Sequence, residues 1–172
     1  TSYLKKEQPN GDDKITLWLP GFKKLRRISS NKKADSFMGS DLSYEDLSSR
    51  DLNENEYKRL GDEKVDEVDC YVLEISPKKE AKSSYSKHIS WIAKEGLYGV
   101  KENSFDKRGE LKKRKVFNFQ KLKEYYVIER VFVEDIQKNH TTEVTFSEVK
   151  VDSGIDKKLF QEKNLKRIPI GF

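Results

Sequence analysis

The sequence has little of the chemistry that catalytic and metal-binding sites require. It contains one cysteine, Cys70, so neither an intrachain disulfide nor a cysteine-based zinc site can form. Its two histidines, His88 and His140, lie far apart and lack the spacing of metal ligands. A glycine-rich phosphate loop and a nucleophile elbow are missing too. We therefore predict a non-enzyme with no catalytic residues, no metal site and no cofactor, and place Cys70 in the core.

Long apolar runs are also absent. No run approaches the ~20 residues that span a bilayer, and the first ten residues, TSYLKKEQPN, lack the apolar centre of a signal peptide. We therefore expect a soluble chain whose targeting segment, if the protein is exported, is not part of this sequence.

The apolar residues that are present follow a pattern typical of β-strands. Although 38% of the 172 residues are charged, most of the nine Phe, eight Tyr and two Trp lie with Val and Ile in short alternating runs. The length suits one domain over residues 1–172. Turn residues separate most runs, and such direct connections require antiparallel neighbours. We predict strands at residues 15–19, 22–28, 57–65, 68–76, 88–94, 98–105, 110–119, 126–134 and 142–151, and about one helical turn at 156–165.

The net charge of +5 raises the question of nucleic-acid binding. The 35 basic residues are, however, interleaved with 30 acidic ones, which describes a solvated surface better than a track for a polyanion. The two densest basic runs, 23–27 and 112–115, fall in the predicted strands 22–28 and 110–119, where lysine would protect solvent-facing edges from aggregation. Nucleic-acid binding therefore remains a remote alternative, and we expect no nucleic-acid partner.

Residues 29–51 differ from the rest because they are rich in Ser and Asp. Ser40 or Asp41 is expected to begin a short helix, with acidic residues in its first turns. A polar connection of this length that still carries large apolar side chains predicts a lid over an apolar surface. The apolar residues of this predicted lid are Phe37, Met38, Leu42, Tyr44 and Leu47.

The same part of the chain carries a family resemblance. Its elements are an aromatic-aliphatic strand that ends in Leu19-Pro20, the basic strand 24–28, SFMGSD at 36–41 and SYEDL at 43–47. Weaker matches follow in the same order, at 57–61, 69–74, 85–87 and 91–92. From residue 17 to 165 the sequence resembles the bacterial outer-membrane lipoprotein-sorting proteins of the LolA-like superfamily.

This resemblance implies a mainly β fold with minor α: a curved antiparallel sheet, or incomplete β-barrel, with a helical lid over a hydrophobic cavity. Family members carry a helix and further strands before the matched region, where this sequence has sixteen residues, so we expect those parts to be lacking. The candidate cavity wall consists of Leu17, Leu19, Ile89, Trp91, Phe117, Phe132 and Phe146. Each of these side chains, and each lid residue, would serve equally in an ordinary core.

The function implied by the resemblance is that of a periplasmic or cell-envelope carrier, which binds acyl chains of lipid or lipoprotein on their way to the outer membrane. An alternative is an accessory protein of an inner-membrane exporter of the resistance-nodulation-division type. The basic runs 23–27 and 112–115 would then be docking surfaces.

Overall fold

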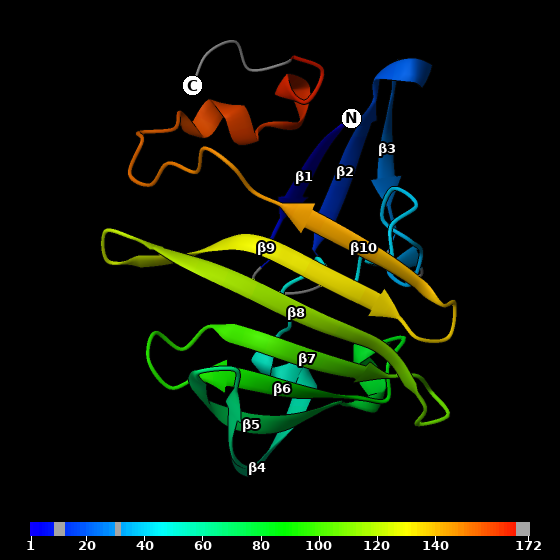
Figure 1. Ribbon diagram of the computed structural model, residues 1–172. Coiled ribbons are helices and arrows are strands. Elements are labelled where there is room, and N and C mark those ends of the chain that lie inside the picture. Colours follow the sequence, from blue (N-terminus) through cyan, green and yellow to red (C-terminus); the bar gives the residue numbers. More distant parts are fainter. Residues whose placement is uncertain (9–12, 30–31, 168–172) are drawn as a thin grey trace. The chain divides into compact units, whose positions relative to one another are not determined.

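The computed structural model describes residues 1–8, 13–29 and 32–167 (Figure 1). The chain divides into two compact units: a first unit of residues 1–33 and 152–172, and a second unit of residues 34–151. Both contain antiparallel β-sheets, as the alternating runs predict. The described residues contain no α-helix, and none of their helices is long and apolar enough to cross a bilayer. A single domain over 1–172 stays a prediction.

The first unit is built on three strands in the order β1-β2-β3. Leu4, Ile15, Leu17 and Ile28 are buried in it. The short lysine-rich strand β1 was not predicted, whereas the helical turn expected at 156–165 is present as two 3-10 helices. The elements are β1 (Ser2–Lys6), β2 (Lys14–Leu19), η1 (Pro20–Phe22), β3 (Lys24–Ile28), η5 (Lys157–Phe160) and η6 (Glu162–Asn164).

The second unit is a seven-stranded meander in the order β10-β9-β8-β7-β6-β5-β4, so every strand pairs with its neighbour in the sequence. All seven strands were predicted, with ends that differ by a few residues. The largest difference is in the last strand, which ends at Thr145 instead of residue 151. The strands are β4 (Asn55–Val65), β5 (Val68–Pro77), β6 (Lys87–Ala93), β7 (Gly99–Phe105), β8 (Leu111–Leu122), β9 (Tyr125–Asp135) and β10 (His140–Thr145), with 3-10 helices η3 (Leu52–Glu54) and η4 (Lys79–Ala81).

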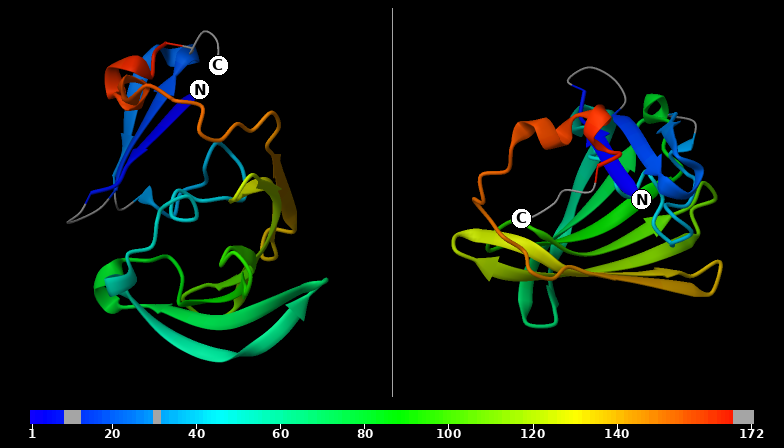
Figure 2. Two further views of the ribbon diagram at one scale, coloured as in Figure 1. Left: turned by 90° about the vertical axis from the view of Figure 1, so that its left-hand side faces the viewer. Right: turned by 90° about the horizontal axis from the view of Figure 1, so that it is seen from above.

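Tight turns and bulges curve this sheet. Val65 pairs directly with Val68 across a two-residue turn in which Asp66 has a φ of 49°, as hairpin turns require. The register shifts once in each of the β4–β5, β6–β7, β7–β8 and β8–β9 pairs. Each such irregularity bends the strand and increases its twist. The predicted curved antiparallel sheet is therefore confirmed, and Figure 2 shows its curl.

The predicted helical lid is wrong. Residues 30–31 of the predicted segment lie outside the described residues, and residues 34–51, which we call the covering segment, form one bridge, between Ser36 and Ser43, and separate turns at 38–39 and 44–47. The Ser43 hydroxyl accepts from the Asp46 N–H (3.1 Å), and the Asp46 carboxylate accepts from the Ser43 N–H (2.8 Å). Ser43, not Ser40 or Asp41, thus begins the second of these turns. No helix begins at Ser40 or Asp41, because the Leu42 carbonyl accepts from the Phe37 N–H (2.7 Å) and the Tyr44 N–H donates to the Asp35 carbonyl (3.2 Å), which pairs the backbone at 42–44 with residues 35–37.

Candidate functional site

Two rows of polar side chains cross one face of the second unit's sheet. Side chains on a strand alternate between faces, so pairing in register aligns residues of neighbouring strands on the same side. All seven of these residues are buried. One row is His88, Ser104, Lys113 and Asp135, and the other is Ser90, Glu102 and Lys115.

The covering segment supplies a buried carboxylate to this face. Asp46 accepts from the Lys113 Nζ at 2.7 Å and from the Tyr85 hydroxyl at 3.0 Å, and it also binds the Lys115 Nζ. The side chains of Asp46, Lys113 and Lys115 are only 1%, 4% and 3% exposed. Burial by itself would raise the pKa of Asp46, but the two ammonium groups hold it far below its usual range. Asp46 is therefore ionised at any physiological pH.

A second carboxylate joins the sheet to the end of the covering segment. Glu102 receives two hydrogen bonds of 2.7 Å from the Arg50 guanidinium, one of 2.8 Å from the Ser90 hydroxyl and one of 3.1 Å from the Lys115 Nζ. Burial acts to raise the pKa of Glu102, and Lys115 and Arg50 outweigh this and lower it. We call Asp46, Arg50, Glu102, Lys113 and Lys115 the buried ionic network. It contains three cations and two anions.

His88 lies beside this network but stays uncharged. Its Nδ1 is 2.8 Å from the Ser104 hydroxyl and 3.5 Å from a Glu102 oxygen. Burial lowers the pKa of His88 to about 3, although the Glu102 carboxylate favours the charged form. An imidazole with such a pKa is a poor proton acceptor at neutral pH. Within the described residues, no group of three or more His, Cys, Asp and Glu side chains could hold a metal ion.

Apolar contacts hold the other part of the covering segment. Leu42 is buried against Val131 and Val133 of β9, and further half-buried side chains surround these three: Phe37, Leu47, Phe117 and Val144. The Phe37 ring also meets the Tyr44 ring edge-on, with centroids 5.7 Å apart. We call Leu42, Val131, Val133 and these four neighbours the apolar cluster. It brings together four residues of the predicted cavity, Phe37, Leu42, Leu47 and Phe117, and Tyr44 contacts it through the Phe37 ring.

The remaining predicted cavity residues lie elsewhere. Met38 and Phe146 are 52% and 46% exposed. Trp91 and Ile89 belong to a separate cluster around buried Cys70, as expected for a core cysteine. Phe132 alternates with Val131 and Val133 along β9 and so faces the opposite side of the sheet. Leu17 and Leu19 belong to the first unit. Their role in ligand binding stays a prediction.

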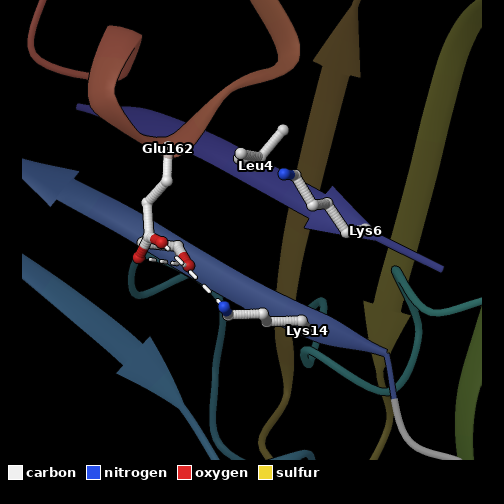
Figure 3. Close-up of a pocket in the computed structure, with 5 residues that line it drawn as sticks. Leu4, Lys6, Lys14 and Glu162 are labelled. Carbon is white, nitrogen blue, oxygen red and sulfur yellow. Dashed lines mark hydrogen bonds and ion pairs between the residues drawn. The ribbon is translucent and has the colours of Figure 1, made fainter. Parts of the chain in front are cut away.

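The first unit contains a small pocket (Figure 3). Leu4, Lys6, Lys14, Thr16 and Glu162 line it, and its volume is about 10 Å³. Glu162 also binds Arg27 at 3.2 Å and thereby attaches η6 to the sheet. A volume of this size holds about one water molecule, so this pocket cannot take an acyl chain.

Solved structures with the same fold identify the family. A protein from Vibrio parahaemolyticus, described as an outer-membrane lipoprotein-sorting protein domain, superposes with a TM-score of 0.87 and 32% identity over 96% of this chain and 71% of that chain. A DUF1329 family protein from Desulfovibrio piger gives a TM-score of 0.86 and 32% identity over 95% and 69% of the two chains. The chain belongs to this family of outer-membrane lipoprotein-sorting protein domains.

A further solved structure shares the fold, and two other comparisons concern the sequence. A LolA superfamily protein from Nitrosomonas europaea has a TM-score of 0.62 at 14% identity, over 94% of this chain and 88% of that chain, and shows the fold alone. A family model described as an uncharacterized protein matches residues 1–167. No curated protein matches the sequence significantly. The predicted resemblance to LolA-like lipoprotein-sorting proteins is thus confirmed.

In this member of the lipoprotein-sorting family, sequence reasoning missed the buried ionic network. Residues 112–115 were interpreted as a solvated edge or a docking surface, which is wrong for Lys113 and Lys115 because both side chains are buried. One signal was available: the Ser43-x-x-Asp46 spacing is typical of a capped turn. The pairing of Asp46 with lysines 67 and 69 residues away follows only from the fold.

Proposed function

We propose that the protein is a non-catalytic carrier, which binds acyl chains of lipid or lipoprotein in the periplasm or cell envelope for transport to the outer membrane. The observation that carries this proposal is the similarity, at 32% identity and a TM-score of 0.87, to a protein described as an outer-membrane lipoprotein-sorting protein domain. The LolA-like fold supports the same class of function.

The apolar cluster is the acyl-binding surface that we propose in the second unit. Here side chains of the covering segment lie on apolar residues of β8, β9 and β10, so an acyl chain could take their place without exposing the sheet. An acyl chain gains about 0.8 kcal/mol per buried methylene, which is about 10 kcal/mol for a dozen of them. Displacing a buried leucine costs about 2–5 kcal/mol. The difference of about 5–8 kcal/mol also covers the loss of the half-buried Phe37 ring from the cluster, which costs at most about 3–5 kcal/mol.

The covering segment would act as a lid attached at its polar end. Asp46 and Arg50 are held by charges that the sheet buries, so separating them from it costs more than moving apolar side chains. Asp41 adds a further attachment to β10: its N–H donates to the Thr142 hydroxyl at 2.9 Å, and its carboxylate accepts from the same hydroxyl at 2.7 Å and lies 2.7 Å from the His140 Nδ1. We propose that Phe37 and Leu42 move while Asp46 stays in place.

Native mass spectrometry of the purified protein, followed by solvent extraction and lipid analysis, tests the carrier function. We expect acyl species in a defined ratio, and saturable uptake of a fluorescent fatty-acyl probe by the delipidated protein. A clean mass that remains clean after incubation with lipid, together with no uptake of the probe, would overturn the proposal.

Two substitutions with opposite effects test the proposed surface. Leu42→Ala removes a side chain that competes with the acyl chain, so we expect tighter probe binding. Phe117→Ala removes part of the wall and should weaken it. Val72→Ala is the matched control, because Val72 is buried in the cluster around Cys70 and its truncation should change stability but not probe affinity. If the wild type and the three variants bind the probe with equal affinity, the acyl chain does not bind at the apolar cluster.

A further inference from the structure

The β2–β3 hairpin of the first unit combines an exposed aromatic tip with unbalanced positive charge. Residues 14–33 contain seven Lys and Arg and no Asp or Glu, whereas the rest of the chain mixes the two signs. The hairpin connection is η1, which Figure 1 shows at the tip of β2 and β3. Phe22 lies in this tip and is 76% exposed. A large ring in contact with water beside several cations calls for an explanation.

The tip holds Phe22 on a fixed backbone. Pro20 sets φ at the first position of η1, and the Lys23 N–H donates to the Pro20 carbonyl oxygen at 3.1 Å. Lys23 itself has a φ of 48°, which reverses the chain into β3. Because the turn is already ordered, burial of Phe22 in another medium costs little conformational entropy.

The cations next to the tip are available to a partner. Arg27 binds Glu162 at 3.2 Å, and Lys14 lies 4.0 Å from the same carboxylate. By contrast, in the part of the chain that the structure describes, Lys23, Lys24 and Arg26 form no ion pair. All three are exposed and stand on or beside β3, the edge strand of its sheet. Their charges are therefore directed at solvent without local compensation.

We infer that this hairpin docks on the surface of an anionic phospholipid bilayer, with Phe22 inserted among the acyl chains and the basic residues at the headgroups. A weak apolar anchor and a basic patch are the two signals that together give stable attachment to a membrane. Single-stranded nucleic acid would instead need a groove with several stacking aromatics, and this hairpin offers a single protruding ring. The inference is independent of whether the protein carries lipid.

Flotation of the full chain with vesicles tests this docking. We expect binding to vesicles of phosphatidylcholine with phosphatidylglycerol, little binding to phosphatidylcholine alone, and weaker binding as salt increases. Phe22→Ser should lower the partition coefficient roughly ten-fold or more. Lys24→Glu combined with Arg26→Glu should lower it roughly a hundred-fold. Both changes lie at exposed positions, and unchanged urea unfolding midpoints would show that the variants are folded.

A matched control lies at another turn. Leu97, between β6 and β7, is 70% exposed with a φ of 53°, but both an acidic and a basic residue, Glu95 and Lys94, precede it in the same turn, so its surroundings are not uniformly basic. Leu97→Ser should leave vesicle binding unchanged. Insertion is read directly from a Phe22→Trp variant, whose added fluorescence should shift to the blue and be quenched by brominated phospholipid.

Three results would overturn the inference. One is a failure to float with anionic vesicles at low salt. Another is binding that Phe22→Ser and the double charge reversal leave intact. The third is retention on immobilised DNA that the same substitutions abolish while vesicles fail to compete, which would assign the patch to nucleic acid. None of these results bears on acyl-probe uptake, so the carrier function fails or survives separately.

Discussion

Two basic runs of similar composition have opposite environments in this protein. In residues 23–27, beside and within the edge strand β3, the basic side chains are exposed. In residues 112–115 of β8, a strand with neighbours on both sides, Lys113 and Lys115 are buried, while the Arg114 side chain between them is 51% exposed. Local sequence does not distinguish the two runs. The strand's place in the sheet and the supply of distant carboxylates do.

The difference follows from the cost of burying a charge. An ammonium leaves water only if carboxylates and further hydrogen bonds replace its hydration. Lys115 meets both Asp46 and Glu102, whereas none of the described residues offers Lys24 a carboxylate. The buried run can therefore position the covering segment specifically. The exposed run is left free to bind something outside the chain.

The largest expected effect comes from the centre of the buried ionic network. Asp46→Asn leaves the Lys113 ammonium buried without a carboxylate in contact, and Lys115 keeps only Glu102. We expect the free energy of unfolding, from urea titration at pH 7, to fall by about 3–5 kcal/mol. Asp62→Asn is the control, because Asp62 pairs with Lys94 at the surface and should change the midpoint little. A small effect of Asp46→Asn would show that the network is hydrated in solution.

A smaller loss is expected from the cation side of the network. Lys115→Met leaves Asp46 with Lys113 and Glu102 with Arg50, so each carboxylate keeps one cation. We expect a loss of about 1–3 kcal/mol, measured in the same way. The Asp46→Asn/Lys115→Met double variant should lose less than the sum of the single losses. Strict additivity would mean that the two side chains are not coupled.

This contrast also shows what the sequence could and could not predict. Along β5, β6 and β9 apolar residues alternate with polar ones, and this pattern can be read within each strand. The strands and their antiparallel order could therefore be predicted. The short β1 has too few apolar residues to show this alternation. The helix expected at Ser40 or Asp41 does not form because the backbone at 41–44 bonds to residues 35–37 and to the Thr142 hydroxyl.

The site residues divide in the same way, into those that local sequence indicates and those that only the fold brings together. Four of the predicted cavity residues meet in the apolar cluster, with Tyr44 against it, because lid and wall residues were chosen for their apolar side chains. The ionic network could not be predicted, since Asp46, Glu102 and Lys115 come together only through the register of β7 and β8 and the path of the covering segment. Composition had pointed to a solvated surface at residues 112–115.

The free energy of unfolding should depend on His88 and on the carboxylates around it in different ranges of pH. The folded-state pKa of His88 is lowered from 6.5 to about 3. Below pH 6.5 the unfolded state therefore binds a proton that the folded state does not, and the free energy of unfolding falls as the pH falls toward 3. Between pH 7 and pH 5 this amounts to about 2 kcal/mol. Asp46 and Glu102, whose pKa values are lowered from 3.8 and 4.5, lose their contribution only below about pH 4.5.

The comparison of wild type with His88→Gln isolates this contribution, because glutamine can still bind Ser104 but does not titrate. We expect urea unfolding of the wild type to lose about 2 kcal/mol more than the variant between pH 7 and pH 5. Parallel losses in the two proteins would mean that His88 is accessible to protons in the folded state.

The smallest expected effect returns to the exposed basic run. Lys24→Met removes a charge that has no ion pair with the described residues and faces solvent, so the free energy of unfolding should change by less than about 0.5 kcal/mol. Lys113→Met, measured alongside, should cost more because it takes one of two cations from buried Asp46. Since Lys24 has no structural role to lose, an effect of Lys24→Met on binding to anionic vesicles would be attributable to the surface itself. A stability loss equal to that of Lys113→Met would instead mean that the run is engaged within the fold.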